Sequence, residues 1–225
     1  MPRARIPPMS DEANPANLTK PKWPATLRAK YVRTHYAQFI DEVEAAAMAN
    51  QTRPLDRNAT VSLREITKAT ARAIMFLDVT TGQETLVAPN AVSIAQAHFE
   101  PQAWMRAIYA DEVPVGFALL EDWTQVDITR LPESDRPGVD AYLHEDKPCV
   151  YLWRFMIDAR YQSMGFGNGA LKLLIAHAAT RPGAAHMLLS FVPAEKNPEP
   201  FYQRHGFMRT GEIDGDEVVM ARPLP

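Results

Sequence analysis

The sequence lacks several features that would place a chain in a well-defined class of protein. It has one cysteine, Cys149, so an internal disulfide is excluded and the chain suits a reducing compartment. No apolar run approaches the roughly 18 residues that are needed to cross a bilayer, and residues 1–15 are too polar for a secretion signal. We therefore expect a cytoplasmic protein that has no membrane partner.

Clustered cations and metal-ligand patterns are also missing. The net charge of −3 gives no basic footprint for nucleic acid, because phosphate binding requires clustered Lys and Arg. The six histidines show no ligand spacing with cysteine or acidic residues, so we expect no metal. What the chain does have is 46% hydrophobic residues, enough to fill the core of a sizeable domain.

Three regions differ in composition. Residues 1–27 are rich in Pro, Ala and Asn without periodicity, and we expect a disordered or extended arm. Residues 28–59 contain an amphipathic helix over Arg28–Gln51 and a linker. The apolar stripe of that helix must bury against the main domain or a second copy, which leaves a homodimer open. Residues 60–225 make up the main domain, with residues 121–147 as an acidic inserted connection.

Strand and helix patterns alternate through the main domain. Expected strands span residues 61–66, 104–110, 113–120, 149–157, 187–192, 207–213 and 217–221, and expected helices span 67–73, 91–99, 166–178 and 197–205. The strand–helix–strand order over residues 149–192 implies a parallel pair, and hairpins at Asp111-Glu112 and Asp214-Gly215 imply antiparallel flanks. The predicted fold class is therefore mixed α/β.

A glycine-containing turn follows the aromatic strand at residues 149–157. It reads Gln162-Ser163-Met164-Gly165-Phe166-Gly167 and opens directly into an amphipathic helix. The glycines let the backbone approach an anion, and the N–H groups and dipole of the helix start favour a pyrophosphate. A turn that only packs the helix against the strand would have the same pattern. The Rossmann and Walker loops fit less well, because they require an acid on the next strand or Gly-Lys-Ser/Thr.

Two motifs together resemble the GNAT acetyltransferase superfamily. One is the loop just described, of the form Gln-x-x-Gly-x-Gly, and the other is Asn197-Pro-Glu-Pro-Phe-Tyr202-Gln-Arg-His-Gly206-Phe207. Further segments over about Val61–Leu224 are similar to the bacterial spermine/spermidine (diamine) acetyltransferase branch. They are Leu63-Arg-Glu-Ile-Thr67, Val87-Ala-Pro-Asn90, Val115-Gly-Phe117 and Tyr151-Leu-Trp-Arg-Phe-Met-Ile-Asp158. The resemblance implies the GNAT fold: a mixed central sheet whose parallel pair is splayed around the coenzyme, with helices on both faces.

The resemblance also implies which residues bind acetyl-CoA, the co-substrate. Backbone groups of Phe155, Met156 and Ile157 would pair with the pantetheine arm, and an N–H such as that of Met156 would polarise the thioester carbonyl. The pyrophosphate would meet the turn and the helix start, whose residues are Gln162, Ser163, Met164, Gly165, Phe166, Gly167 and Asn168. Asn197 would cap the short helix and touch the coenzyme, and Tyr202 would also contact it.

Tyr202 is the expected catalytic residue, as general acid for the coenzyme thiolate. A phenol with a pKa near 10 can donate a proton without being ionised at rest; a tyrosine that only packs is the alternative. The general base stays open. Several GNAT enzymes carry a glutamate on the central strand eleven positions before the loop, where this chain has Tyr151. Glu84 and Glu100 border the expected acceptor region, as substrate contacts or as solvated loop residues.

Other features bear on the coenzyme and the acceptor. Ser163-Met164 stands where the family often has a cation, a role that Lys172 could take. The acidic connection would attract a polyamine, or it is a solvated loop. Trp104, Trp123 and Trp153 line an amine pocket or belong to the core. The predicted function is acetyl transfer from acetyl-CoA to the primary amine of a small cationic acceptor such as spermidine or spermine. The alternatives are a protein or drug amine, or a non-catalytic acyl-CoA-binding module.

Overall fold

The computed structural model describes residues 55–84, 86–126, 148–194 and 197–225. These belong to one compact unit, Arg53–Pro225, and the description is confined to it. The arm at residues 1–27, the helix expected over Arg28–Gln51 and the acidic connection from residue 127 onward lie outside the described residues. In the described part of the chain, no helix has the length and apolar character needed to cross a bilayer.

Strands and helices alternate along the chain much as the sequence predicts. The strands are β1 (Val61–Arg64), β2 (Ala103–Ala110), β3 (Val113–Asp122), β4 (Cys149–Ile157), β5 (His186–Phe191), β6 (Met208–Asp214) and β7 (Glu217–Pro223). The helices are α2 (Ala71–Met75), α3 (Asn90–Ala97), α5 (Phe166–Ala179) and α6 (Glu199–Gln203), with 3-10 turns η3 (Trp123–Gln125) and η6 (Ala159–Tyr161).

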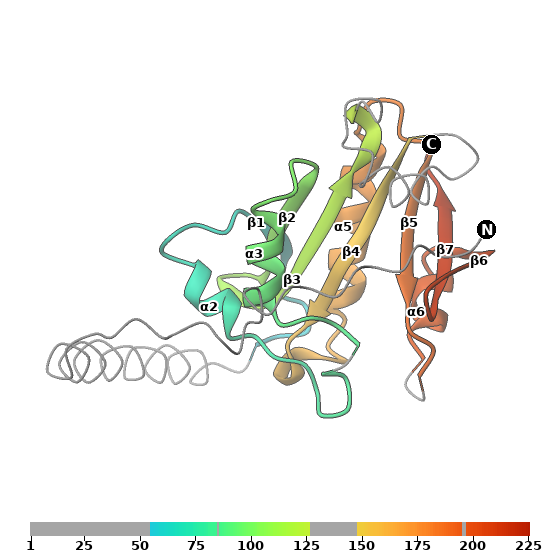
Figure 1. Ribbon diagram of the computed structural model, residues 1–225. Helices are drawn as coiled ribbons and strands as arrows, with labels where there is room; N and C mark the ends of the chain where they lie inside the picture. Colours follow the sequence, from blue (N-terminus) through green and yellow to red (C-terminus); the bar gives the residue numbers. More distant parts are fainter. Residues whose placement is uncertain (1–54, 85, 127–147, 195–196) are drawn as a thin grey trace, which may run out of the picture. The chain divides into compact units, whose positions relative to one another are not determined.

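The strands form one mixed sheet in the order β1-β2-β3-β4-β5-β7-β6 (Figure 1). Neighbouring strands are antiparallel except β4 and β5, which run parallel. Their pairing extends from Cys149 opposite His186 to Leu152 opposite Leu189 and stops there, although β4 continues to Ile157. The two strands therefore diverge in their second halves, which confirms the prediction of a splayed parallel pair.

Helices cover both faces of the sheet (Figure 1). On one face α5 buries Phe166, Leu171 and Leu174 against β4, β5 and the neighbouring strands. The other face carries α2 and α3, where Ile74 is fully buried beside Phe117 of β3. The apolar positions of α5 recur at helical spacing, so this helix must present one stripe to the sheet. The mixed α/β class with helices on both faces is confirmed.

Several element boundaries differ from the sequence prediction, and the contacts of the structure explain two of them. Helix α2 begins at Ala71 rather than near Thr67, because Thr67 and Thr70 form a turn in which the Thr67 carbonyl accepts from the amides of Thr70 and Ala71. Strand β3 runs on to Asp122, so the acidic connection starts later than residue 121. The carboxylate of Glu121 is buried and accepts from Trp123 Nε1. Acidic residues indicate solvent exposure in a sequence, and this tertiary contact overrides that signal.

Candidate active site

A cleft of about 740 Å³ opens where β4 and β5 diverge. The second half of β4 and the end of β5 form its walls, and the turn before α5 and helix α6 close its ends. The segment between α2 and α3 lines it as well, through Val79, Gln83 and Val87. A ligand in this cleft therefore meets segments that are far apart in the sequence.

The β4 wall is shaped by a bulge. Leu119 of β3 pairs with Arg154 and Leu120 pairs with Leu152, so Trp153 lies between two paired residues. Beyond the bulge Phe155, Met156 and Ile157 line the cleft; their contact with the pantetheine arm stays a prediction. Gly116 of β3 lies directly behind them, and a Cβ atom there would come within 2.4 Å of the Met156 carbonyl oxygen. Only glycine permits this close support of the β4 backbone.

The turn before α5 has the backbone geometry of an anion site. Gly165 adopts φ 96°, in the left-handed region, immediately before the first helical residue, and Ser163 also has a positive φ of 62°. Ser163, Gly165, Gly167 and Asn168 line the cleft. Because the first N–H groups of a helix have no partner within it, they can donate to an anion here. The turn therefore fits a pyrophosphate through its backbone.

Two residues of the turn that were predicted to bind the coenzyme pack their side chains into the hydrophobic core. Phe166 is 1% exposed and belongs to the cluster under α5, and Met164 packs against the same cluster. Neither lines the cleft. Their backbone groups remain part of the turn, so these residues can contribute N–H donors but no side-chain contact.

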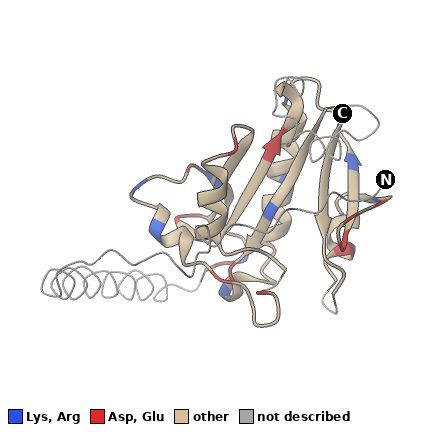
Figure 2. Ribbon diagram, in the orientation of Figure 1, with Lys and Arg blue, Asp and Glu red and all other residues tan. Residues whose placement is uncertain are grey.

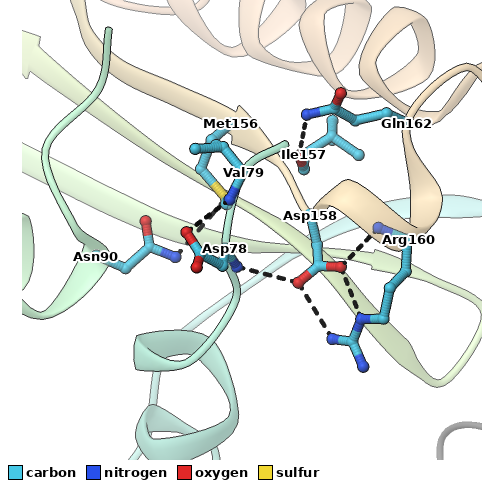
Figure 3. Close-up of polar contacts among 8 residues, drawn as sticks. All are labelled: Asp78, Val79, Asn90, Met156, Ile157, Asp158, Arg160 and Gln162. Carbon is cyan, nitrogen blue, oxygen red and sulfur yellow. Dashed lines mark hydrogen bonds and ion pairs between the residues drawn. The ribbon is translucent and has the colours of Figure 1, made fainter. Parts of the chain in front are cut away.

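Asp158 joins the turn to the segment after α2 (Figure 3). Its carboxylate is 3% exposed and accepts from the Asp78 amide at 3.1 Å and from the Arg160 amide at 3.0 Å. The Arg160 guanidinium forms an ion pair with it at 2.7 Å and donates a second bond at 3.1 Å. Several donors therefore hold this buried charge, which fixes two loops relative to each other.

The side chain of Gln162 makes a second connection between the same two loops. Its amide nitrogen donates to the Ile157 carbonyl at 3.0 Å (Figure 3) and to Gln83 Oε1 at 2.9 Å, and its oxygen accepts from Thr80 at 2.8 Å. Gln162 lines the cleft as predicted. Because its side-chain amide is engaged within the protein, its main role in this structure is to hold the segment between α2 and α3 against the turn.

Helix α6 presents Tyr202 to the cleft. The N-cap residue is Pro198 rather than the predicted Asn197, but Asn197 Oδ1 still accepts from the amide of Glu199, the first helical residue, at 2.9 Å. Arg209 of β6 donates two bonds of 2.6 Å to Glu199, which fixes the helix to the sheet. Tyr202 lines the cleft and packs edge-on against Phe207. Burial raises the pKa of the Tyr202 phenol, so it keeps its proton through neutral pH.

Several other predicted residues lie away from the cleft. Asn197 does not line it, whereas the adjacent Pro198 does. Glu84 accepts from the Gly82 amide in an exposed turn, and Glu100 accepts from Gln102; neither lines the cleft. Lys172 does not reach it either.

The tryptophans divide between the cleft and the core. Of the three considered as amine ligands, Trp153 alone lines the cleft. Trp104 stacks on His177, with ring centroids 3.9 Å apart, and Trp123 is buried in a cluster with Tyr151. Of the two alternatives, the packing role therefore applies to Trp104 and Trp123, and only Trp153 is placed to contact a ligand in the cleft.

The cleft also contains residues that the sequence did not single out. Arg204 at the end of α6 and Arg154 on β4 bring positive charge to it, and Ser190 of β5 and Glu217 of β7 also line it. A cation is therefore available near the cleft, supplied by Arg204 rather than by Lys172. Ser190 could have been identified from the sequence, because it is a polar residue near the end of a buried strand. No sequence pattern pointed to Glu217, because only the pairing of β5 with β7 brings it to the cleft.

Comparison with known proteins agrees with this geometry. Residues 72–207 match the Acetyltransferase (GNAT) family, and the chain belongs to that family. It is an N-acetyltransferase by class. The chain is also similar to a spermine/spermidine N(1)-acetyltransferase of Bacillus subtilis (strain 168), with 28% identity over 169 residues, 73% of this chain and 99% of that protein.

Solved structures show the same fold at low identity. A ribosomal-protein-S18-alanine N-acetyltransferase from Escherichia coli matches with a TM-score of 0.50 and 16% identity, over 73% of this chain and 94% of that one. Ard1 from Thermoplasma volcanium matches with a TM-score of 0.51 and 14% identity, over 74% of this chain and 99% of that one.

Proposed function

We propose that this protein transfers the acetyl group of acetyl-CoA to a primary amine of a small cationic acceptor, with spermidine and spermine as the leading candidates. One observation carries the proposal: a single cleft is lined both by the glycine turn at the start of α5 and by the half-buried phenol of Tyr202. Family membership supports acetyl transfer as the reaction. A cytoplasmic location and a homodimer built on residues 28–51 stay predictions of the sequence.

The cleft offers a place for each part of acetyl-CoA. The pyrophosphate would bind the backbone N–H groups of residues 163–168, with the α5 dipole adding partial positive charge. The pantetheine arm would lie along residues 155–157, on the edge of β4 that β5 leaves unpaired beyond Leu152. Arg204 supplies a cation on the α6 side. The acetyl group would then lie in the splay, beside Tyr202.

Acidic residues of the β6–β7 hairpin favour a cationic acceptor (Figure 2). A second cavity of about 250 Å³ shares Ser190 with the cleft and is lined by Glu212 and Asp214. Among the described residues that line this cavity there is no Lys, Arg or His. Such a surface attracts ammonium groups. The similarity to a spermine/spermidine acetyltransferase supports the same substrate class.

Release of the coenzyme thiol tests the proposal with the full chain. Acetyl-CoA is offered with spermidine, spermine, an aminoglycoside, or a peptide that carries a free amino terminus, and thiol release is followed in each case. We expect release with the polyamines at a higher kcat/KM than with the drug or the peptide. Release with the peptide or the drug alone would contradict the proposed acceptor. Acetyl-CoA binding with no release for any amine would contradict transferase activity itself.

A further inference from the structure

The cleft contains a carboxylate that has not yet been given a role. Glu217, the first residue of β7, is the only acidic side chain among the described residues that line the cleft. No lysine or histidine accompanies it there; the other charged lining residues are Arg154 and Arg204. An ammonium acceptor must lose a proton before its nitrogen can attack a thioester. Of the ionisable groups that line the cleft, the carboxylate of Glu217 is the one suited to take it.

A hydrogen-bonded chain holds this carboxylate. Ser190 Oγ donates to Glu217 Oε2, and the Tyr151 hydroxyl lies 2.6 Å from Ser190 Oγ. A serine hydroxyl has one hydrogen, so Tyr151 must be the donor to Ser190. Burial raises the pKa of Tyr151 to about 12, so its phenol keeps the proton that this arrangement needs. The chain therefore runs from Tyr151 through Ser190 to Glu217.

Three adjacent strands bring these side chains to one face. Tyr151 on β4 pairs with Leu188 on β5, and Ser190 follows Leu188 by two residues. Ser190 pairs with Val219 on β7, and Glu217 precedes Val219 by two residues. Because residues two apart on a strand share a face, all three side chains lie on the same face of the sheet. Tyr151, Leu188 and Val219 form a cluster separate from the one under α5, so this is the face away from α5.

We propose that Glu217 is the general base of the acetyl transfer, and that Ser190 and Tyr151 are positioning residues for it. This inference rests on the proposed function, because it names the group that prepares the acceptor amine for attack. Tyr151 occupies the strand position at which several GNAT enzymes carry a glutamate, and in this chain the carboxylate would come from β7. The acceptor would enter from the face that carries the β6–β7 hairpin.

The transfer requires two protons to leave the acceptor nitrogen and one to reach the coenzyme sulfur. The acceptor binds as an ammonium ion against the Glu217 carboxylate, which takes one proton and leaves a neutral amine. The amine nitrogen forms a bond to the thioester carbon, and the carbon–sulfur bond breaks as the tetrahedral intermediate collapses. The nitrogen loses its second proton to solvent, and the departing thiolate gains one from Tyr202, which is reprotonated from solvent. Glu217 returns its proton to solvent, so the products are an acetylated amine, free coenzyme A and one proton.

The first test replaces Glu217 with glutamine in the full chain. Asp216→Asn is the matched control, since Asp216 is an exposed acid on the same hairpin and lines neither cavity. We expect Glu217→Gln to lower kcat for spermidine by about a hundredfold or more. The dissociation constant for acetyl-CoA and the thermal midpoint should stay within experimental error, which separates loss of the base from loss of the fold. Asp216→Asn should behave as wild type.

The second test uses pH and acceptor basicity, which a merely structural role would not affect. Without the base, the variant can use only the amine that is already neutral in solution. Its kcat/KM for spermidine should therefore rise about tenfold per pH unit from neutral pH up to the pKa of the amine, whereas wild type should rise less steeply. With an acceptor amine whose own pKa lies near 7, the loss caused by Glu217→Gln should shrink to less than about tenfold.

Tyr151→Phe tests the positioning chain. It removes the donor to Ser190 and should lower kcat less than Glu217→Gln does, with the wild-type slope of the pH profile retained. Wild-type kcat and pH profile in Glu217→Gln, measured alongside an active wild-type protein, would overturn the inference and leave the proposed function standing. If the wild-type protein acetylates only an amine that is not a polyamine, and Glu217→Gln loses that activity, the proposed acceptor is overturned and the role of Glu217 as general base is supported. An inactive wild-type protein would overturn both.

Discussion

At the scale of single residues, burial sets the protonation state of the groups around the cleft. Tyr202 lines the cleft with its pKa raised by burial, which keeps it as a proton donor at neutral pH. We predict that Tyr202→Phe lowers kcat by about a hundredfold, with acetyl-CoA binding unchanged. Pre-steady-state kinetics would establish that chemistry limits the rate.

Tyr109→Phe is the matched control for that variant. Tyr109 is a buried tyrosine of β2 under the Arg64 guanidinium and does not line the cleft. It should keep wild-type kcat. Unchanged turnover in Tyr202→Phe, under conditions in which the chemical step is rate-limiting, would remove Tyr202 from the catalytic role.

Burial also raises the pKa of Glu121, and this shift affects the stability of the fold. It is 6% exposed, and burial raises the pKa of its carboxyl from 4.5 to about 7. Between these values the folded state holds a proton that the unfolded state releases, so this group makes stability fall as pH rises and has no further effect above about pH 7. We predict that the free energy of unfolding of Glu121→Gln, relative to that of wild type, rises by about 3 kcal/mol between about pH 5 and pH 8.

Urea unfolding of both proteins at the two pH values measures this difference. The comparison of one variant across pH cancels any change in packing that the substitution itself causes, because that change is present at both values. A free-energy difference between the proteins that does not change with pH would show that the carboxyl is not titrating in this range.

At the scale of elements, the cleft depends on how two loops are tied together. Asp158 binds the amide of Asp78 and the guanidinium of Arg160, so it connects the segment between α2 and α3 to the turn before α5. We predict that Asp158→Ala raises KM for acetyl-CoA and for the acceptor together by about tenfold, because small displacements of binding groups weaken both sites. The free energy of unfolding should fall by about 2 kcal/mol, as expected for lost bonds to a buried charge.

Arg160→Gln is the informative companion to that variant. It removes the ion pair but leaves the bond from the Asp78 amide to Asp158, so the segment between α2 and α3 stays attached. Steady-state kinetics with each substrate varied should give a smaller rise in KM for the acceptor than Asp158→Ala gives. Equal effects of the two variants on the acceptor would contradict the idea that Asp158 carries the connection.

The sequence predicted elements well where the pattern was local. The strand at Cys149–Ile157 was predicted with its observed bounds, because a short, continuous run of aromatic and apolar residues is compatible with few structures other than a buried strand. Helix α5 and the hairpin at Asp214-Gly215 also follow from local spacing and turn chemistry. The end of β3 was missed, since Glu121 is buried by contacts made with Trp123 and neighbouring elements rather than by its own pattern.

At the scale of the whole molecule, the sequence identified residues of the turn and of α6 that line the cleft, but not those of β5 and β7. The turn at residues 162–168 and helix α6 lie on short, contiguous motifs, so their residues could be named in advance. Glu217 and Ser190 meet only because β7 inserts between β5 and β6 in the sheet. That pairing is non-local, and no spacing in the sequence encodes it. Glu84 and Glu100, chosen by position along the chain, lie off the cleft for the same reason.

The most direct measurement of the central claim is the mass of the acceptor after reaction. The full chain is incubated with acetyl-CoA and spermidine, and the polyamine and coenzyme are analysed by mass spectrometry against a reaction without protein. The account predicts spermidine that carries one acetyl group on a primary amine, formed in equal amount to free coenzyme A and lost with Tyr202→Phe. Unmodified spermidine beside intact acetyl-CoA, from a protein shown to bind the coenzyme, would contradict it.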